Sequence, residues 1–330
     1  MSTPWTYLSL AHLGALRVRG RDVVSFLQGQ LSSDVAQLHE ARALLAGYHN
    51  PQGRVIALLQ LLQLAPAEVL AILPRELLQP VASRLSRFIL RSKVQLADES
   101  AAWRIDALIA PAAAQAPTAG GAHARAAPSF ADLLPDAPQG VARIDQCLAV
   151  RSGAQPARWL LICPLEPAAA AGSHPALAQC APAAPDLWRR LAVESGEPQV
   201  YAATSEEFVA QMLNLDVLGA IAFDKGCYTG QEVIARAHYR GRVKRRLQRF
   251  RSRAPLELRA GDTGEFTDGR AFRVVEAVRL EDGACEFLAV APLAAAETVA
   301  SGAPAGQAAP TAQHARLDAE QLPLPYALPQ

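Results

Sequence analysis

The stretch from Lys225 to Glu232, Lys-Gly-Cys-Tyr-Thr-Gly-Gln-Glu, places a cysteine between two glycines and two residues after a lysine. Thr229 and Glu232 have the spacing of a capping box, which predicts that a helix begins at Thr229. Cys227 would then lie just before a helix N-terminus and near the ammonium of Lys225, and both features stabilise a thiolate. The pattern predicts a functional loop that presents Lys225 and Cys227. The alternative is a glycine-bounded turn around an incidental buried cysteine.

The chain contains five cysteines: Cys147, Cys163, Cys180, Cys227 and Cys285. No two of them have Cys-x-x-Cys spacing, their number is odd and they lie far apart in the sequence. The pattern therefore predicts neither a disulfide framework nor a metal site. A reducing compartment fits this cysteine usage best.

The chain has 330 residues, of which 51% are hydrophobic and 19% charged, with a net charge of +1. This length suits about two or three domains, and the balanced charge excludes strong global steering towards nucleic acid. The N-terminus lacks a basic segment followed by an apolar core, so we expect a cytoplasmic protein. The longest apolar stretch, 55–73, is interrupted by Gln60, Gln63, Pro66 and Glu68, and we expect no membrane span.

Alternating and periodic apolar patterns predict the elements of the first third. Strands are expected at 13–19, 42–48, 54–64, 69–73, 93–96 and 103–109, and helices at 22–30, 33–38 and from Pro74 onwards. A turn at 49–53 would join the second and third strands. Strands interspersed with helices in this order predict an α+β fold.

The rest of the chain alternates between patterned and Ala/Pro-rich stretches. Strands are expected at 141–150 and 159–163, a helix from Asp186 to Ser195, and Ala/Pro-rich breaks at 110–127, 167–185 and 294–313. Short strands at 247–250, 264–266, 272–278 and 285–290, separated by glycine turns, predict a small antiparallel barrel. The prolines of 322–329 predict an extended terminal segment.

The segment 236–253 carries nine cations and no acid. One interpretation is a tRNA-binding segment that contacts several phosphates. The other is a barrel strand whose arginine stems cover apolar surface. Only Tyr239 and Phe250 could stack on bases there, which favours the second interpretation.

The motif at 225–232 resembles the signature of the YgfZ-type folate-binding proteins, which are relatives of the aminomethyltransferase (T-protein) of the glycine cleavage system. The segments 26–31, 50–54 and 322–329 reinforce the resemblance, which spans nearly the whole chain outside the Ala/Pro-rich stretches. It implies an aminomethyltransferase-like ring of three domains with ferredoxin-like α+β domains and a C-terminal barrel. We expect a folate-binding domain at 1–46 and 140–240, a second α+β domain at 47–139 and the barrel at 241–330.

The resemblance implies that tetrahydrofolate or another folate derivative binds in or near the central hole. It also implies a role in iron–sulfur cluster assembly or repair linked to tRNA modification, with iron–sulfur proteins or their assembly machinery as partners. Cys227 and Lys225 would be the catalytic residues. The expected folate-binding residues are Glu194, Gly226, Tyr228, Gly230, Gln231, Arg54 and Asn214.

Glu194 would hold the pterin edge, because a carboxylate accepts two adjacent N–H donors; a solvated residue at a helix end is the alternative. A folate-dependent aminomethyl or methyl transferase is the alternative function. The T-protein, however, relies on an aspartate near the folate nitrogens, and Asp98 is the one candidate here, with neighbours that do not support it. Whether the chain is an enzyme is left open by these residues.

Overall fold

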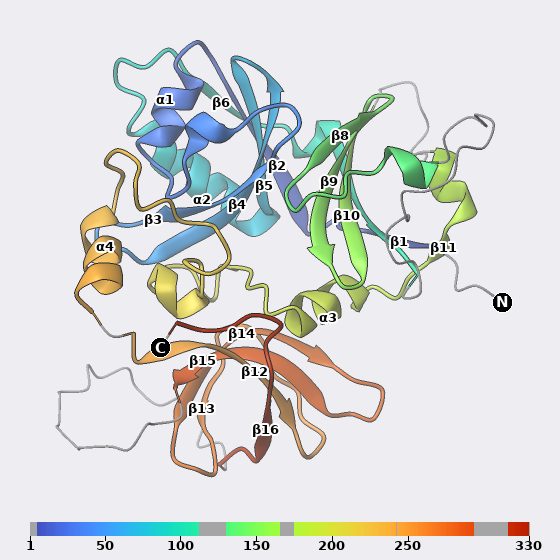
Figure 1. Cartoon of the computed structure of the whole chain (residues 1–330), viewed down its shortest axis with the longest axis vertical. Coiled ribbons are helices and arrows are strands. Elements are labelled where there is room, and N and C mark those ends of the chain that lie inside the picture. Colours follow the sequence, from blue (N-terminus) through green and yellow to red (C-terminus); the bar gives the residue numbers. More distant parts are fainter. Residues whose placement is uncertain (1–4, 112–129, 166–174, 242, 294–315, 330) are drawn as a thin grey trace.

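Three sheets, arranged as three lobes, form the molecule (Figure 1). The computed structural model describes residues 5–111, 130–165, 175–241, 243–293 and 316–329. Most of the predicted Ala/Pro-rich stretches lie outside the described residues. No helix in these ranges is long and apolar enough to cross a bilayer.

The first sheet has five antiparallel strands in the order β3-β4-β5-β2-β6. Their bounds are β2 Leu13–Arg19, β3 Leu44–His49, β4 Val55–Ala65, β5 Glu68–Pro74 and β6 Gln95–Asp98. Helices α1 (Val23–Gln28) and α2 (Arg75–Ser86) accompany this sheet, with a 3-10 turn, η1, at Val35–Gln37. Helix α2 begins one residue after the predicted start, so that Pro74 is its N-cap and not a residue of its first turn.

The central strands β4 and β5 of the first sheet are buried on both faces over most of their length. In β5, Val69, Ala71 and Leu73 join the core under the helices, whereas Leu70 and Ile72 pack against the second sheet. Because successive side chains of a strand point to opposite faces, an almost continuous apolar run is what two packed faces require.

The second sheet has six strands in the order β11-β1-β7-β10-β9-β8. Their bounds are β1 Thr6–Ser9, β7 Trp103–Ile109, β8 Val141–Ile144, β9 Cys147–Ala154, β10 Ala157–Pro164 and β11 Ala181–Pro182. Short 3-10 turns accompany it at η2 (Ser100–Ala102), η3 (Phe130–Leu133) and η4 (Pro175–Gln179). The single strand predicted at 141–150 is a hairpin, because Asp145 turns the chain with φ of +52°.

Cys147 and Cys163 form a disulfide between β9 and β10, which corrects the prediction that the cysteines have no disulfide partners. The pairing of Leu148 with Ile162 in the antiparallel ladder brings the two neighbouring cysteines opposite each other. A separation of 16 residues along the chain thus says little about proximity once a hairpin forms.

The third sheet has five strands in the order β13-β14-β15-β12-β16. Their bounds are β12 Arg245–Ser252, β13 Thr263–Glu265, β14 Ala271–Arg279, β15 Cys285–Pro292 and β16 Ala319–Leu322. The predicted barrel is not closed within the described residues: between the two edges, only one isolated bridge, Phe266 with Leu317, is formed. Four phenylalanines fill the inner face of this open sheet: Phe250, Phe266, Phe272 and Phe287.

The sheets divide the chain differently from the expected domain boundaries. The boundary at 46/47 falls inside β3, and that at 139/140 separates β7 from its partner β10. The third sheet begins at Arg245, four residues after the expected boundary at 240/241.

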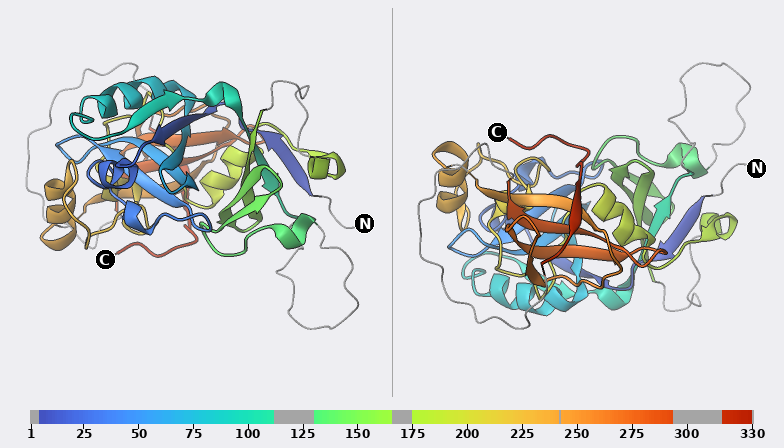
Figure 2. Two further views of the ribbon diagram at one scale, coloured as in Figure 1. Left: turned by 90° about the horizontal axis from the view of Figure 1, so that it is seen from above. Right: turned by 90° about the horizontal axis from the view of Figure 1, so that it is seen from below.

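The remaining helices lie between the lobes and at the edge of the molecule. Helix α3 (Leu187–Glu194) packs against β14 and β15 near the centre, whereas α4 (Gln231–Tyr239) lies at the periphery (Figure 1). A 3-10 turn, η5 (Ala210–Leu213), contacts both α4 and β12. The views in Figure 2 place α4 and the second sheet, with the N-terminus, at opposite ends of the molecule.

Candidate functional site

The side chain of Lys225 connects the loop that contains the motif at 225–232 to the end of α1 and the segment that follows it. Its ammonium donates to the carbonyl oxygens of Gln28 at 2.8 Å, Leu31 at 2.7 Å and Ser33 at 2.8 Å. An ammonium has three N–H donors, so all three are engaged. Burial lowers the pKa of Lys225 to about 8, and Asp34 opposes that shift. Lys225 therefore holds two loops together in this structure.

The other residues of the motif shape the same loop. The ring of Tyr228 is buried and lies 5.1 Å from the Lys225 ammonium, and burial raises the pKa of Tyr228 to about 12. Gly230 has φ of +83°, and a Cβ there would lie 2.5 Å from the carbonyl oxygen of Asn50. The amide of Gln231 reaches back to the carbonyl of Lys225 at 3.5 Å. These contacts give the loop one defined path.

The predicted capping box is wrong. Helix α4 begins at Gln231 with Gly230 as its N-cap, and no side chain caps it. Gly230 takes this position because its left-handed conformation lets the chain approach the β3–β4 turn closely. Thr229 therefore lies outside the helix.

Cys227 is exposed at the tip of this loop. The interpretation of an incidental buried cysteine is therefore wrong. The two other cysteines outside the disulfide are less accessible: Cys180 is half-buried and Cys285 is buried. Gly226 is exposed as well, with open space around its Cα. The motif thus presents one thiol to the outside.

A cavity of about 200 Å³ lies where the three lobes meet. The first sheet contributes Leu13, Leu45, Leu58, Gln60 and Ile72, the second Ser152 and Leu160, α3 contributes Trp188, Arg189 and Ala192, and the third sheet contributes Glu276. None of the residues from Lys225 to Glu232 lines it. The motif and the cavity are therefore two separate sites.

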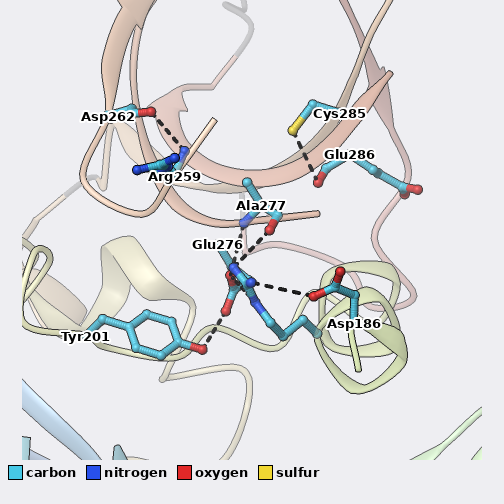
Figure 3. A network of polar contacts seen from close by, with 9 residues as sticks. Asp186, Tyr201, Arg259, Asp262, Glu276, Ala277, Cys285 and Glu286 are labelled. Atoms are coloured by element: carbon cyan, nitrogen blue, oxygen red, sulfur yellow. Dashed lines mark hydrogen bonds and ion pairs between the residues drawn. The ribbon is translucent and has the colours of Figure 1, made fainter. Parts of the chain in front are cut away.

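Glu276 on β14 organises one wall of the cavity. Its carboxylate accepts from Arg189 of α3 at 2.7 Å and from the hydroxyl of Tyr201 at 2.7 Å (Figure 3). Burial and the charge of Glu276 raise the pKa of Tyr201. His12 also lines the wall, and burial lowers its pKa, whereas Glu276 opposes that shift. The buried carboxylate of Glu276 therefore joins the third sheet to α3.

Glu197 provides a second carboxylate at the cavity. One of its oxygens accepts from the fully buried Arg158 at 2.7 Å, while the Glu197 side chain stays 35% exposed. Burial raises the pKa of Glu197, and Arg158 opposes that shift. Glu194, the residue expected to hold the pterin, instead pairs with Arg190 at 2.9 Å and does not line the cavity.

Two amides face each other on a further wall. Gln60 of β4 donates to the side chain of Gln139 at 2.6 Å, and both residues line the cavity. The backbone of Gln139 bonds to Ala43 on one side and to Arg151 on the other. The backbone hydrogen bonds of Gln139 therefore connect the first sheet to the second at this pair.

The remaining predicted residues lie away from the cavity. The guanidinium of Arg54 donates to the carbonyls of Glu206 and Glu207. The buried side chain of Asn214 bonds to the carbonyl of Leu247 and to Arg246. Both residues hold backbone segments in place, and no contact with the cavity supports the folate role expected of them.

Sequence reasoning missed the polar lining of the cavity, although two signals were present. Gln60 interrupts the apolar run of β4, and Glu276 interrupts that of β14. A single polar residue inside an otherwise buried strand is a signal of a buried site, because such a group needs a partner. Glu197 carried no such signal in the sequence.

Four arginines of β12 and its end are paired with acids. Arg246 bonds to Asp216 at 2.8 Å, and Arg249, Arg251 and Arg253 pair with Glu286, Asp282 and Asp318. This part of the basic segment stabilises the third sheet, in agreement with the second interpretation. Among the described residues, no cluster of His, Cys, Asp or Glu could hold a metal ion.

No family model matches the chain. A solved structure, the glycine cleavage system aminomethyltransferase T from Bartonella henselae, has a TM-score of 0.66 at 16% identity, with 88% of this chain and 79% of that chain covered. The two share the fold, which confirms the predicted aminomethyltransferase-like α+β architecture.

Curated relatives resemble the chain in sequence. The protein of Edwardsiella ictaluri named tRNA-modifying protein YgfZ is 32% identical, covering 99% of this chain and 94% of the relative. Proteins of the same name from Escherichia coli O45:K1 and Yersinia pseudotuberculosis are 31% and 32% identical, each covering 85% of this chain. With this identity over nearly its full length, the chain belongs to the YgfZ family.

Proposed function

We propose that the chain is a cytoplasmic folate-binding protein that supports iron–sulfur cluster assembly or repair linked to tRNA modification. The central cavity would hold the pterin ring of tetrahydrofolate. The observation that carries this proposal is a cavity lined from all three lobes of an aminomethyltransferase-like fold. The names of the relatives support the link to tRNA.

The lining suits a flat heteroaromatic ring. Leucines and Trp188 provide apolar walls, and Glu197 with the pair Gln60 and Gln139 provides polar groups at the edges. The pterin carries adjacent N–H donors, which a carboxylate accepts side by side. We assign this role to Glu197, because Glu194 is engaged by Arg190 outside the cavity lining.

The volume limits how much of the ligand the cavity encloses. Pockets for drug-sized ligands measure roughly 300–1,000 Å³, whereas this cavity measures about 200 Å³. A bicyclic ring suits this space better than a whole folate, so the glutamate tail would extend outside. A bound folate would contact all three lobes and stabilise their arrangement.

Cys227 would serve a partner protein. It is exposed and belongs to a loop outside the cavity lining, which favours contact with a partner over attack on a one-carbon unit of the folate. A thiolate is a suitable ligand for iron, but one cysteine cannot hold a cluster alone. An iron–sulfur protein or its assembly machinery would supply the other ligands.

A folate-dependent aminomethyl transferase has less support. The resemblance requires an aspartate near the folate nitrogens, and Asp98 lies on β6, where it accepts from the backbone of Ser100. No aspartate is among the residues lining the cavity. A folate-bound structure with a carboxylate against the folate nitrogens N5 and N10 would favour the transferase instead.

The ligand proposal is tested by titration with 5-formyltetrahydrofolate, followed by the fluorescence of Trp188 and by calorimetry. Glu197→Gln should weaken binding by about tenfold or more, because a hydrogen bond to a charged group contributes about 1.5–3 kcal/mol. Glu194→Gln is the matched control and should bind like the wild type. Equal loss in both variants, or loss only in Glu194→Gln, would contradict the assignment of Glu197.

The cellular role is tested in a strain that lacks the chain. Restoring the wild type should restore thiolated nucleosides in tRNA, measured by mass spectrometry, whereas Cys227→Ser should not. Cys285→Ser is the control, because that thiol is buried. Full restoration of thiolated nucleosides by Cys227→Ser would show that the Cys227 thiol is not required.

A further inference from the structure

An aromatic stack lies on the outer side of α4. The rings of Phe223 and His238 are parallel to within 19° at 3.8 Å, and Tyr239 meets both edge-on at 6.1 Å and 4.7 Å. Phe223 is half-buried against the main core, whereas His238 is exposed and Tyr239 is 68% exposed. Phe223 therefore fixes the stack to the core, whereas the rings of His238 and Tyr239 are accessible to solvent.

Exposed cations lie on the same helix end as the stack or close to it in the sequence. Arg236, Arg240 and Lys244 are exposed, and no ion pair with them is formed among the described residues. This separates them from Arg246, Arg249 and Arg251 of β12, which have acidic partners. Two exposed acids, Asp224 and Glu232, lie on the same loop and helix, so the face carries charges of both signs.

We propose that this face, formed by Phe223, Arg236, His238, Tyr239 and Arg240, binds the unpaired bases of an RNA loop. The cations alone would attract any polyanion, but bases stack on exposed aromatic faces only where they are unpaired. A duplex would engage the cations and leave the rings unused. An acidic protein surface would do the same.

This inference rests on the proposed link to tRNA, and it deepens that link by assigning the surface. The face adjoins the loop of Cys227, because Phe223 precedes Lys225 by two residues. An RNA held here would lie beside the exposed thiol and away from the central cavity. Folate binding and RNA binding can therefore be measured independently.

The test is fluorescence anisotropy of the full chain with a labelled RNA stem-loop and with a fully paired RNA of the same length. We expect the wild type to prefer the stem-loop. Tyr239→Ala should weaken stem-loop binding by about fivefold or more, since stacking on one aromatic ring changes affinity by at least that factor. Tyr239→Phe, which keeps the ring, should bind like the wild type.

The charge contribution is read from the salt dependence. Removing Arg236 and Arg240 together (R236Q with R240Q) should lower the slope of log affinity against log salt by about 0.7 for each cation. Arg251→Gln is the matched control, because Arg251 is exposed but paired with Asp282. It should leave the slope unchanged.

Three outcomes would overturn the inference: equal affinity for the paired RNA and the stem-loop, full binding by Tyr239→Ala, or an unchanged slope in the double variant. The first two would show that RNA binds through the cations alone and that the aromatic rings take no part. Retained titration of Tyr239→Ala with 5-formyltetrahydrofolate shows that the variant is folded. If the wild type does not bind 5-formyltetrahydrofolate, the folate proposal is contradicted, but the RNA-binding result still holds.

Discussion

The ammonium of Lys225 lies 2.8 Å from the carbonyl oxygen of Ser33, and this contact joins the loop before α4 to the segment after α1. The two residues are 192 positions apart in the chain. Together with the bonds to Gln28 and Leu31, the contact connects the motif at 225–232 with the segment 26–31, which carries part of the family resemblance. The two motifs form one structural unit that presents Cys227.

Replacing Lys225 should destabilise this unit. Lys225→Met removes three donors and leaves three carbonyls without their partner, which we expect to lower the free energy of unfolding by roughly 2–4 kcal/mol. Urea unfolding followed by circular dichroism measures the change. Lys244→Met is the control, because Lys244 is exposed. Equal stability of the two variants would show that the three bonds contribute nothing.

Gly230 and Gly226 flank Cys227 but should respond differently to alanine. Gly230→Ala forces a side chain into a left-handed conformation and against the Asn50 carbonyl, so we expect a loss of about 1–3 kcal/mol. Gly226→Ala meets open space and should change the free energy of unfolding by less than about 0.5 kcal/mol. Thermal unfolding of both variants checks the difference, and a reversed order would contradict the account of the loop.

Cys227 should be the first thiol to react. It is exposed, whereas the side chain of Cys285 is 1% exposed and needs local opening to meet a reagent. We expect iodoacetamide to modify Cys227 at least about tenfold faster than Cys285 in the native protein. Peptide mass spectrometry at successive times measures both rates. In urea both thiols should react at similar rates. Similar rates of Cys227 and Cys285 in the native protein as well would contradict the exposed position of Cys227.

His49 should make the protein less stable in acid. The side chain is fully buried, neither ring nitrogen has a hydrogen-bond partner in the described structure, and burial lowers its pKa to about 3. Between pH 6.5 and pH 3 the unfolded chain binds a proton at this residue and the folded chain does not. Stability is therefore fully present above pH 6.5 and is lost as the pH falls, by up to about 1.4 kcal/mol per pH unit.

The variant His49→Gln removes this titration and should flatten the dependence of unfolding free energy on pH over that range. His39→Gln is the control, because His39 is exposed. Urea unfolding at several pH values gives the slopes. A wild-type slope that persists in His49→Gln would assign the acid sensitivity to other groups.

Several elements were predictable because their signal is local. β2 (Leu13–Arg19) and β7 (Trp103–Ile109) have the predicted bounds, since an alternating apolar pattern needs no knowledge of the partner strand. The segment 141–150 was not predictable as a hairpin, because nothing in its pattern marks Asp145 as the turn. The prediction of a closed barrel was wrong for a different reason. Closure depends on how the two edge strands of the sheet meet, and the sequence of one strand does not encode this.

The motif at 225–232 and the family it indicates are determined by the sequence alone, because residue types at fixed spacing are local information. Only the tertiary structure decided what each member of the motif contacts. Lys225 is engaged by three carbonyls from a distant segment, Cys227 faces outwards, and the cavity is lined by Glu197 and Glu276 instead of by the motif. Contacts between segments follow from packing and strand pairing across the whole chain, and a sequence pattern carries no distances between them.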